Sequence, residues 1–192
     1  RPLKARSALP YARAVRFCPS TDVRDTLNMR TRPANFYKMI DLKSCSMRLK
    51  GTNQEEVHTE IIENFKAAEA IDEELGAVAT EALLERERMA STGIGRGVAI
   101  AHVKVRGLEE ARLAVSIHKE GLDWRSLDRE PIQLMITVLR PDRPSELHDP
   151  EQHIELMRWV QRLAQDEDFI TFALRLKNKK ELRSLLKEKA GI

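Results

Sequence analysis

The residues best suited to chemistry lie close together between Arg86 and His102. Glycine stands at every second position from Gly93 to Gly97, and a short apolar run then leads to His102. Glycine lets the backbone take positive φ angles or pass close to another group, and a turn that only joined two elements would rarely need three. A histidine at the end of a buried strand beside such a turn is held in place and still reachable. This suits a residue that collects a chemical group from one partner and passes it to another.

The same stretch resembles the phosphorylation site of the enzyme IIA domains of the mannitol/fructose class. These domains belong to the bacterial phosphoenolpyruvate:sugar phosphotransferase system and include its nitrogen-regulatory branch. The family pattern runs roughly L-x-R-E-x-x-G-S-T-G-I-G-x-G-x-A-x-P-H, and the positions that match it here are Leu84, Arg86, Glu87, Ser91, Thr92, Gly93, Ile94, Gly95, Gly97, Ala99 and His102. Two positions differ, because Ala90 replaces the usual glycine and Ala101 replaces the usual proline. The resemblance covers about residues 39–188.

This resemblance implies a phosphocarrier, and therefore a phosphotransferase. His102 would accept a phosphoryl group from the phosphohistidine of an HPr-type carrier protein. It would pass the group to an enzyme IIB, or its phosphorylation state would regulate partner proteins as in the nitrogen branch. Because the sequence contains no enzyme IIB segment, it slightly favours the regulatory branch. The alternative is a protein-interaction module on the same fold that is no longer phosphorylated, and the change at Ala101 is its main support.

Three residues are the candidates for catalysis. A neutral imidazole at His102 can attack phosphorus, and such a transfer needs mainly positioning and charge stabilisation. Arg86 precedes His102 by 16 residues, a spacing at which the family carries an arginine, and a guanidinium suits phosphate. His153 follows a helix start at Asp149, where the helix dipole disfavours imidazolium, and the family carries a second active-site histidine there. The alternatives are a surface cation at a helix end for Arg86 and an ordinary first-turn histidine for His153.

The turn itself supplies the remaining candidate site residues, which we expect to fix the loop or to bind phosphate. Ser and Thr side chains fix turns by bonding to nearby backbone, and glycine amides can donate to phosphate oxygens as backbone nests do. Contact between Thr92 and phosphate is the weaker expectation. These candidates are Ser91, Thr92, Gly93, Gly95 and Gly97.

Other kinds of site do not fit the sequence. The glycine spacing is not a dinucleotide fingerprint, because a strand follows where a helix must open. His148 and His153 lack partners at zinc spacing. We therefore expect neither a cofactor nor a metal.

Hydrophobic periodicity and capping residues predict the elements that position these residues. A capping-box pattern at 52–55 begins a helix with Val57, Ile61 and Phe65 inward, and Asp72 caps a second helix. Residues 40–49 suggest a short edge segment, 111–118 an alternating strand, and 132–139 a central strand covered on both faces. Three helices are then expected from Asp149, from 166 and over 179–189.

The order of these elements, with helices before and after paired strands, indicates an α/β sandwich. The family resemblance refines this to a three-layer α/β sandwich with a small mixed central sheet and helices on both faces. On the helix that starts at Asp149 we expect Ile154, Met157, Val160 and Ala164 to face inward, with Leu156 and Leu163 beside them. Two other histidines are expected at the surface: His58 on the first helix, and His118 at a strand end.

Composition and charge limit the remaining function classes. Residues 1–38 hold nine of the 33 Lys/Arg and two of the 30 Asp/Glu, a charge of +7, and the rest sums to −4. A mildly acidic body does not favour nucleic-acid binding, and no apolar run approaches the ~20 residues of a membrane span. Two cysteines are too few for a disulfide framework and fit the reducing cytoplasm. We expect 1–38 to be a basic, disordered leader, with a docking arm as the alternative, and 39–192 to be the phosphocarrier domain.

Overall fold

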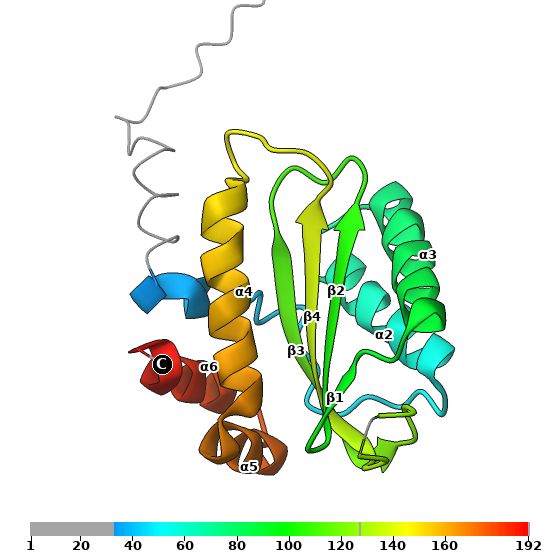
Figure 1. The fold of residues 1–192 in the computed structure, drawn as a ribbon, viewed down its shortest axis with the longest axis vertical. Coiled ribbons are helices and arrows are strands. Elements are labelled where there is room, and N and C mark those ends of the chain that lie inside the picture. The colour runs from blue at the N-terminus through cyan, green and yellow to red at the C-terminus, as the bar shows by residue number, and fades with distance from the viewer. Residues whose placement is uncertain (1–32, 127, 192) are drawn as a thin grey trace, which may run out of the picture.

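The computed structural model describes residues 33–126 and 128–191. In this part of the chain a central sheet is covered by helices on both faces (Figure 1). The strands run in the order β1-β2-β4-β3, with β2 parallel to β4 and the other neighbours antiparallel. Their bounds are Gly93–Gly95 for β1, Val98–Val105 for β2, Arg112–Leu122 for β3 and Ile132–Pro141 for β4. The predicted three-layer α/β sandwich with a mixed sheet is confirmed.

Two groups of helices form the outer layers (Figure 1). One layer consists of α2, Gln54–Ala67, and α3, Glu73–Met89. The other consists of α4, Pro150–Gln165, α5, Glu167–Arg175, and α6, Lys179–Glu188, together with the 3-10 helices η1, Pro33–Met39, and η2, Lys189–Gly191. Among the described residues, none of these helices is long and apolar enough to cross a membrane.

The sheet is buried along its middle strand. β4 lies between β2 and β3, and the side chains of Ile136 and Val138 on one face and of Met135 and Leu139 on the other are at most 1% exposed. The prediction of a central strand covered on both faces is therefore confirmed, and it explains why the sequence is apolar almost without interruption there. β3 is longer than predicted, and a segment at 41–49 runs beside it through backbone bonds such as Asp41 N to Leu113 O at 2.8 Å.

The helix starts follow their capping residues. Asp72 accepts a hydrogen bond from the amide of Leu75, as its position predicts. At α2 the N-cap is Asn53, whose side chain accepts from the amide of Glu56 at 2.9 Å. The predicted capping box at 52–55 is thus wrong by one residue, because Glu56 is the acid that reaches back, to the amide and hydroxyl of Thr52.

Helix α4 begins as predicted, and most of its predicted inward face is buried. The side chain of Asp149 accepts from the amide of Glu151 at 2.9 Å, and Pro150 occupies the first turn. Val160 and Ala164 are buried as predicted, and so are Leu156, Leu163 and the unpredicted Trp159. The prediction for Ile154 is wrong: it is 52% exposed. The buried stripe runs through Trp159, whose ring packs against Phe36 of η1 with centroids 6.2 Å apart, and Ile154 lies outside it.

Both histidines that were expected at the surface are buried, so these predictions are wrong. His58 is 1% exposed, because Trp124 covers this flank of α2 with ring centroids 5.2 Å apart. His118 is 7% exposed, because β3 continues beyond it, and its Nε2 lies 3.0 Å from the carbonyl oxygen of Gly51.

The predicted leader lies mostly outside the described residues. The part that is described forms η1, and Phe36 within it is 1% exposed. The boundary at Met39 between a leader and a domain stays a prediction.

Candidate active site: a histidine pair between β2 and α4

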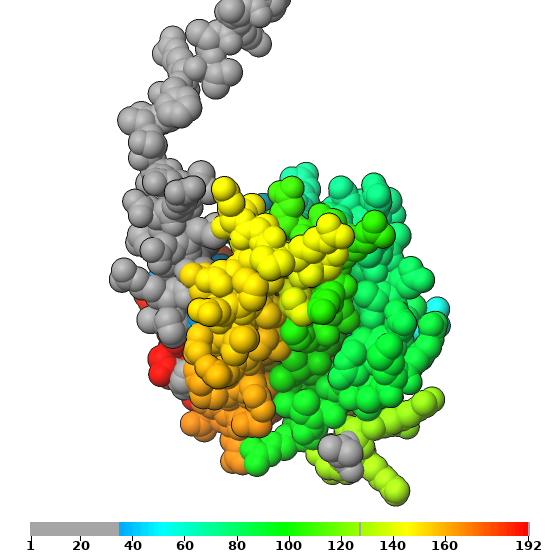
Figure 2. All heavy atoms as spheres, turned by 45° about the horizontal axis from the view of Figure 1, so that its top comes forward, coloured from blue at the N-terminus to red at the C-terminus, as the bar shows by residue number. Residues whose placement is uncertain are grey.

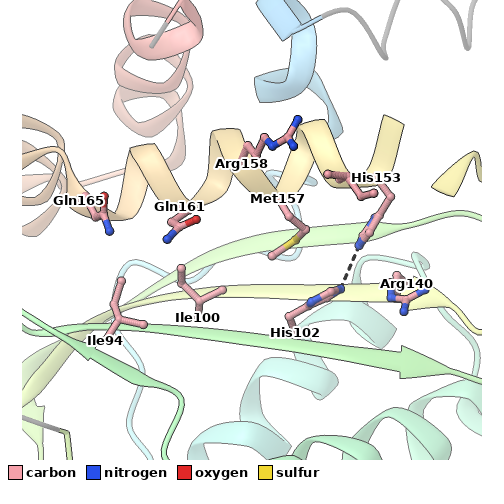
Figure 3. A pocket seen from close by; sticks show the side chains of 10 residues that line it. Ile94, Ile100, His102, Arg140, His153, Met157, Arg158, Gln161 and Gln165 are labelled. Carbon is pink, nitrogen blue, oxygen red and sulfur yellow. Dashed lines mark hydrogen bonds between the residues drawn. The ribbon is translucent and has the colours of Figure 1, made fainter. Parts of the chain in front are cut away.

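His102 and His153 come from different layers and meet between them. His102 projects from β2, and His153 projects from the first turns of α4 toward it (Figure 3). Their Nε2 atoms lie 2.9 Å apart although the residues are 51 positions apart in sequence. The strand does not end at His102 as the sequence suggested, because β2 continues to Val105. The histidine is therefore held by strand on both sides.

The hydrogen bond between the two rings indicates how their protons are arranged. One Nε2 must carry a hydrogen and the other must accept it. Nδ1 of His153 is buried and has no hydrogen-bond partner. A buried N–H without an acceptor is rarer in proteins than an unsatisfied lone pair. This favours the form in which His153 carries its proton on Nε2 and donates it to the Nε2 lone pair of His102.

Burial and nearby cations keep both rings neutral. Burial, followed by the charges of Arg140, Arg86 and Lys104, lowers the pKa of His102 to about 4. Burial and the neighbouring imidazoles lower the pKa of His153 to about 3. Each shift has the sign expected when a charged form is desolvated or placed near like charge. At neutral pH His102 is thus an uncharged imidazole, the form that can act as a nucleophile.

Arg140 is a site residue that the sequence analysis missed. It lies at the end of β4, and its neighbour in the parallel register of β2 is Lys104. It lines the same cavity as His102 and His153 (Figure 3). The signal in the sequence is an arginine that closes an otherwise apolar strand, but only the pairing of β4 with β2 brings it to the histidines.

The structure places Arg86 near the site, but holds its side chain elsewhere. Its Nη1 donates to the carbonyl oxygen of Ala90, just beyond the end of α3, at 2.6 Å. Such a bond between a basic side chain and a carbonyl at a helix C-terminus is common. The charge of Arg86 still lowers the pKa of His102, after burial and Arg140. Arg86 therefore contributes charge to the site, and its guanidinium is already engaged.

A cavity of about 540 Å³ opens beside the histidine pair. It extends along α4 from the histidines to Ile94 of β1 (Figure 3). In Figure 2 the edge of β2, in green, reaches the surface between α4, in yellow to orange, and α3, in blue-green. The cavity is lined by Ile94, Ile100, His102, Arg140, His153, Ile154, Met157, Arg158, Gln161 and Gln165. His102, His153 and Arg140 lie at one end of it, and Ile94, Ile100 and Met157 give it apolar walls (Figure 3).

Comparison with known proteins agrees with this geometry. The family model of the phosphoenolpyruvate-dependent sugar phosphotransferase system, EIIA 2, matches residues 21–189. The chain belongs to this family. Members of the family are phosphotransfer components of that system, and the predicted resemblance is confirmed.

Two relatives and one solved structure show the range of this enzyme IIA family. The chain is 30% identical over 110 residues to the PTS system fructose-specific EIIA component of Haloferax volcanii, which covers 57% of this chain and 68% of that protein. It is 34% identical over 80 residues to the nitrogen regulatory protein of Pseudomonas aeruginosa, with 42% and 49% covered. The crystal structure of the nitrogen regulatory protein IIA-Ntr from Neisseria meningitidis has a TM-score of 0.65 at 20% identity, covering 79% of this chain and 98% of that one. At 20% sequence identity, this structural similarity is evidence for a shared fold alone.

In this enzyme IIA chain the Ser-Thr corner bonds within the protein. The hydroxyl of Ser91 donates to the carbonyl oxygen of Trp124 at 2.7 Å and accepts from the amide of Gly93. The hydroxyl of Thr92 donates to Glu87 at 2.6 Å and accepts from the indole of Trp124. Thr92 is 2% exposed, and its one hydroxyl hydrogen is used, so it has none to donate to a phosphate. A phosphate-binding role for these residues stays a prediction.

The three glycines of this enzyme IIA form β1 and the hairpin that joins it to β2. Gly93 pairs with Ala99, and Gly95 and Gly97 have φ angles of 95° and 71°. A side chain at either of these two positions would be strained. The carbonyl oxygen of Gly97 accepts from the amides of Gln133 and Leu134, so the hairpin is anchored on β4. The glycines thus set the start of the strand that carries His102.

Glu87 ties the turn to the helices behind it and is a second residue whose role the sequence did not show. Its carboxylate accepts from the amide and hydroxyl of Thr92 and from Gln54. Nε2 of His58 lies 3.5 Å away, and the two side chains are 1% and 5% exposed. Burial acts to raise the pKa of Glu87, but the nearby His58 and the hydrogen bonds from Thr92 outweigh it and the pKa is lowered. The carboxylate is therefore charged and buried beneath the turn.

Proposed function

We propose that this enzyme IIA chain is a phosphocarrier that is phosphorylated on Nε2 of His102. The observation that carries the proposal is the bond between Nε2 of His153 and Nε2 of His102 at 2.9 Å, in a cavity with Arg140. It joins a neutral nucleophile, a hydrogen-bond donor and a cation at one place. These are the groups that phosphoryl transfer uses, since its catalysis is mostly positioning and charge stabilisation.

The donor in this proposal is the phosphohistidine of an HPr-type carrier protein. The Nε2 lone pair of His102 attacks phosphorus while the phosphorus–nitrogen bond of the donor breaks, and the donor nitrogen keeps that electron pair. His153, displaced from the lone pair by phosphorus, then donates its Nε2 hydrogen to a phosphoryl oxygen. Because the phosphoryl group replaces the hydrogen bond that exists in the free protein, only small side-chain shifts are needed.

The apolar part of the cavity is the proposed docking surface for the donor. Ile94 is 43% exposed and Ile154 is 52% exposed, and Ile100 and Met157 line the cavity between Ile94 and the histidines (Figure 3). Apolar side chains around a reactive centre exclude water when a partner covers them, which strengthens electrostatic interactions at the site. A carrier that exchanges phosphoryl groups with such partners works in the cytoplasm.

The acceptor in the proposal is either the cysteine of an enzyme IIB or, in the regulatory branch, no acceptor at all, with phosphorylation serving as the signal. We favour the regulatory branch, since the relatives include nitrogen regulatory proteins of comparable identity to the fructose-specific component. A module that is not phosphorylated is the second candidate, favoured by Ala101. Ala101 lies inside β2, opposite Thr137 of β4, and the strand still delivers His102 to His153.

Incubation with phosphoenolpyruvate, enzyme I and HPr, followed by intact mass, tests the proposal. The wild-type protein should gain one phosphoryl group that is lost in acid and stable in base. His102→Ala should gain none and keep its melting temperature. His153→Ala should gain the group about 10²- to 10³-fold more slowly, as when one donor to a developing charge is removed. Uptake by folded His102→Ala, or peptide mapping of the group to His153 or Ser91, would show that the assignment is wrong.

A further inference from the structure

Arg140 is a cation without a counterion in the part of the chain that the structure describes. Among residues 33–126 and 128–191, no carboxylate lies within ion-pair distance of its guanidinium, whereas Arg96, Arg112 and Arg158 each pair with a glutamate. Its Nε is buried and has no hydrogen-bond partner. Its Nη1 makes only a long bond, 3.4 Å, to the carbonyl oxygen of Pro141. A buried donor left unsatisfied costs free energy, so this guanidinium can take a further partner beyond those that the described residues supply.

The surroundings of Arg140 indicate that the missing partner is an anion. Lys104 lies opposite it in the β2–β4 register, so two cations stand at the same end of the parallel strands. The charge of Arg140 contributes to lowering the pKa of His102, of His148 and of His153. The side chain lines the cavity beside the two histidines that bond to each other (Figure 3). Positive charge concentrated in a partly buried cavity attracts an anion of the size of phosphate.

Arg86 is less available for the same task. Its Nη1 is bonded to the carbonyl oxygen of Ala90 at 2.6 Å, and it does not line the cavity. To contact a group on His102 it would have to give up that bond. Arg140 has no comparable bond to break.

We propose that Arg140 is the residue that binds the oxygens of the phosphoryl group carried by His102. This rests on the proposed phosphorylation of His102. The guanidinium donates N–H bonds to the phosphoryl oxygens while the bond from phosphorus to Nε2 of His102 forms and the donor's phosphorus–nitrogen bond breaks. No proton leaves the arginine. Arg140 and His153 then hold the group from two sides, and Arg86 adds charge from farther away.

The test compares Arg140→Gln and Arg140→Lys with Arg86→Gln and with a matched control, Arg143→Gln. Arg143→Gln removes the same charge from the loop just after β4, where the side chain of Arg143 is exposed and pairs with Asp142. One measurement is the rate of phosphoryl uptake from phosphorylated HPr. The other is binding of inorganic phosphate to the unphosphorylated protein, followed by NMR of the His102 and His153 ring signals. Melting temperatures identify any variant that does not fold.

We expect Arg140→Gln to weaken phosphate binding and slow uptake by about 10- to 100-fold, the usual effect of losing a charge-assisted bond. Arg140→Lys should keep part of both, because the charge remains and the planar fork is lost, and it supplies the test if Arg140→Gln fails to fold. Arg86→Gln should have a smaller effect, and Arg143→Gln should behave as wild type.

The outcomes separate this inference from the proposed function. Phosphate binding that depends on Arg140, in a protein that HPr does not phosphorylate, would support the anion site and refute the phosphocarrier. Wild-type uptake and phosphate binding in folded Arg140→Gln would refute the role of Arg140 and leave the phosphocarrier intact. Wild-type protein that binds no phosphate, or a larger loss in Arg86→Gln than in Arg140→Gln, would also overturn the inference.

Discussion

Two histidines, His102 on β2 and His58 in the helix layer on the other face of the sheet, have contrasting neighbours (Figure 1). On the α4 side, His102 faces His153, with Nε2 atoms 2.9 Å apart, in a cavity that opens to solvent. On the other side, Nε2 of His58 on α2 faces the carboxylate of Glu87 on α3 at 3.5 Å, and both side chains are almost fully buried. The first histidine has cations and a second imidazole around it. The second has an anion and an indole.

The contrast shows how one side-chain type serves chemistry in one place and structure in another. Cations near His102 disfavour its protonation and leave its lone pair for a phosphorus atom. The carboxylate of Glu87 lies 3.5 Å from Nε2 of His58, and the indole of Trp124 packs against the imidazole ring. The network of Glu87 holds the turn that begins the strand of His102. We call His58 with Glu87 and Trp124 the closed site, and His102 with His153 and Arg140 the open site. The closed site thus supports the open one.

The largest expected effect comes from removing the anion of the closed site. Glu87→Ala should destabilise the protein by about 3–5 kcal/mol, because removing one partner of a buried network leaves the others unpaired. The amide and hydroxyl of Thr92 and the side chain of Gln54 would lose their acceptor, and His58 would lose its neighbouring carboxylate. The measurement is the free energy of unfolding in urea.

The control for this variant is Glu85→Ala, which removes an exposed carboxylate from the same helix. It should change stability by less than about 0.5 kcal/mol, as surface substitutions do. Equal effects in the two variants would mean that the Glu87 network does not hold the turn.

The second prediction uses the pKa values of the open site. The pKa of His102 is lowered to about 4 and that of His153 to about 3, both from 6.5. As the pH falls below about 6.5, the unfolded chain binds protons on these residues before the folded protein does. Stability should therefore fall between pH 6.5 and about 4, by up to about 1.4 kcal/mol per pH unit for each proton. Above pH 7 the pair should have no such effect.

Urea unfolding across this pH range, in wild type and in His102→Gln/His153→Gln, isolates the contribution of the pair. The double variant should lose less stability than wild type as the solution is acidified, since the carboxylates that also titrate are common to both. Parallel curves would argue that the rings take up protons as readily when folded as when unfolded, and that the cations do not keep them neutral.

The smallest expected effect concerns the cap that begins the helix of His153. Asp149→Ala removes the acceptor for the amide of Glu151 and should cost about 1 kcal/mol, the usual value for an N-cap. The residue is exposed, so water replaces the lost bond, unlike at Glu87. Thermal unfolding measures the loss, and phosphoryl uptake should fall only slightly. A loss as large as that of Glu87→Ala would mean that the open site depends on its supports as strongly as the closed one.

The sequence by itself determined the elements and the family. Asp72 and Asp149 cap helices where predicted, and the apolar run that starts at Ile132 became the central strand. These features depend on bonds within a few residues or on periodicity along one element, so the sequence carries them directly. The glycine-rich match leading to His102 was long enough to indicate the enzyme IIA family.

Tertiary structure alone decided which side chains meet. His102 and His153 are 51 residues apart, and Arg140 joins them only because β4 pairs in parallel with β2. His58 looked exposed because nothing in α2 itself shows that Trp124 covers it. Neighbours in space are set by strand order, helix rotation and the loops between them. These depend on packing over the whole core, so local pattern could name the candidate residues without showing which would face a partner, a cation or a carboxylate.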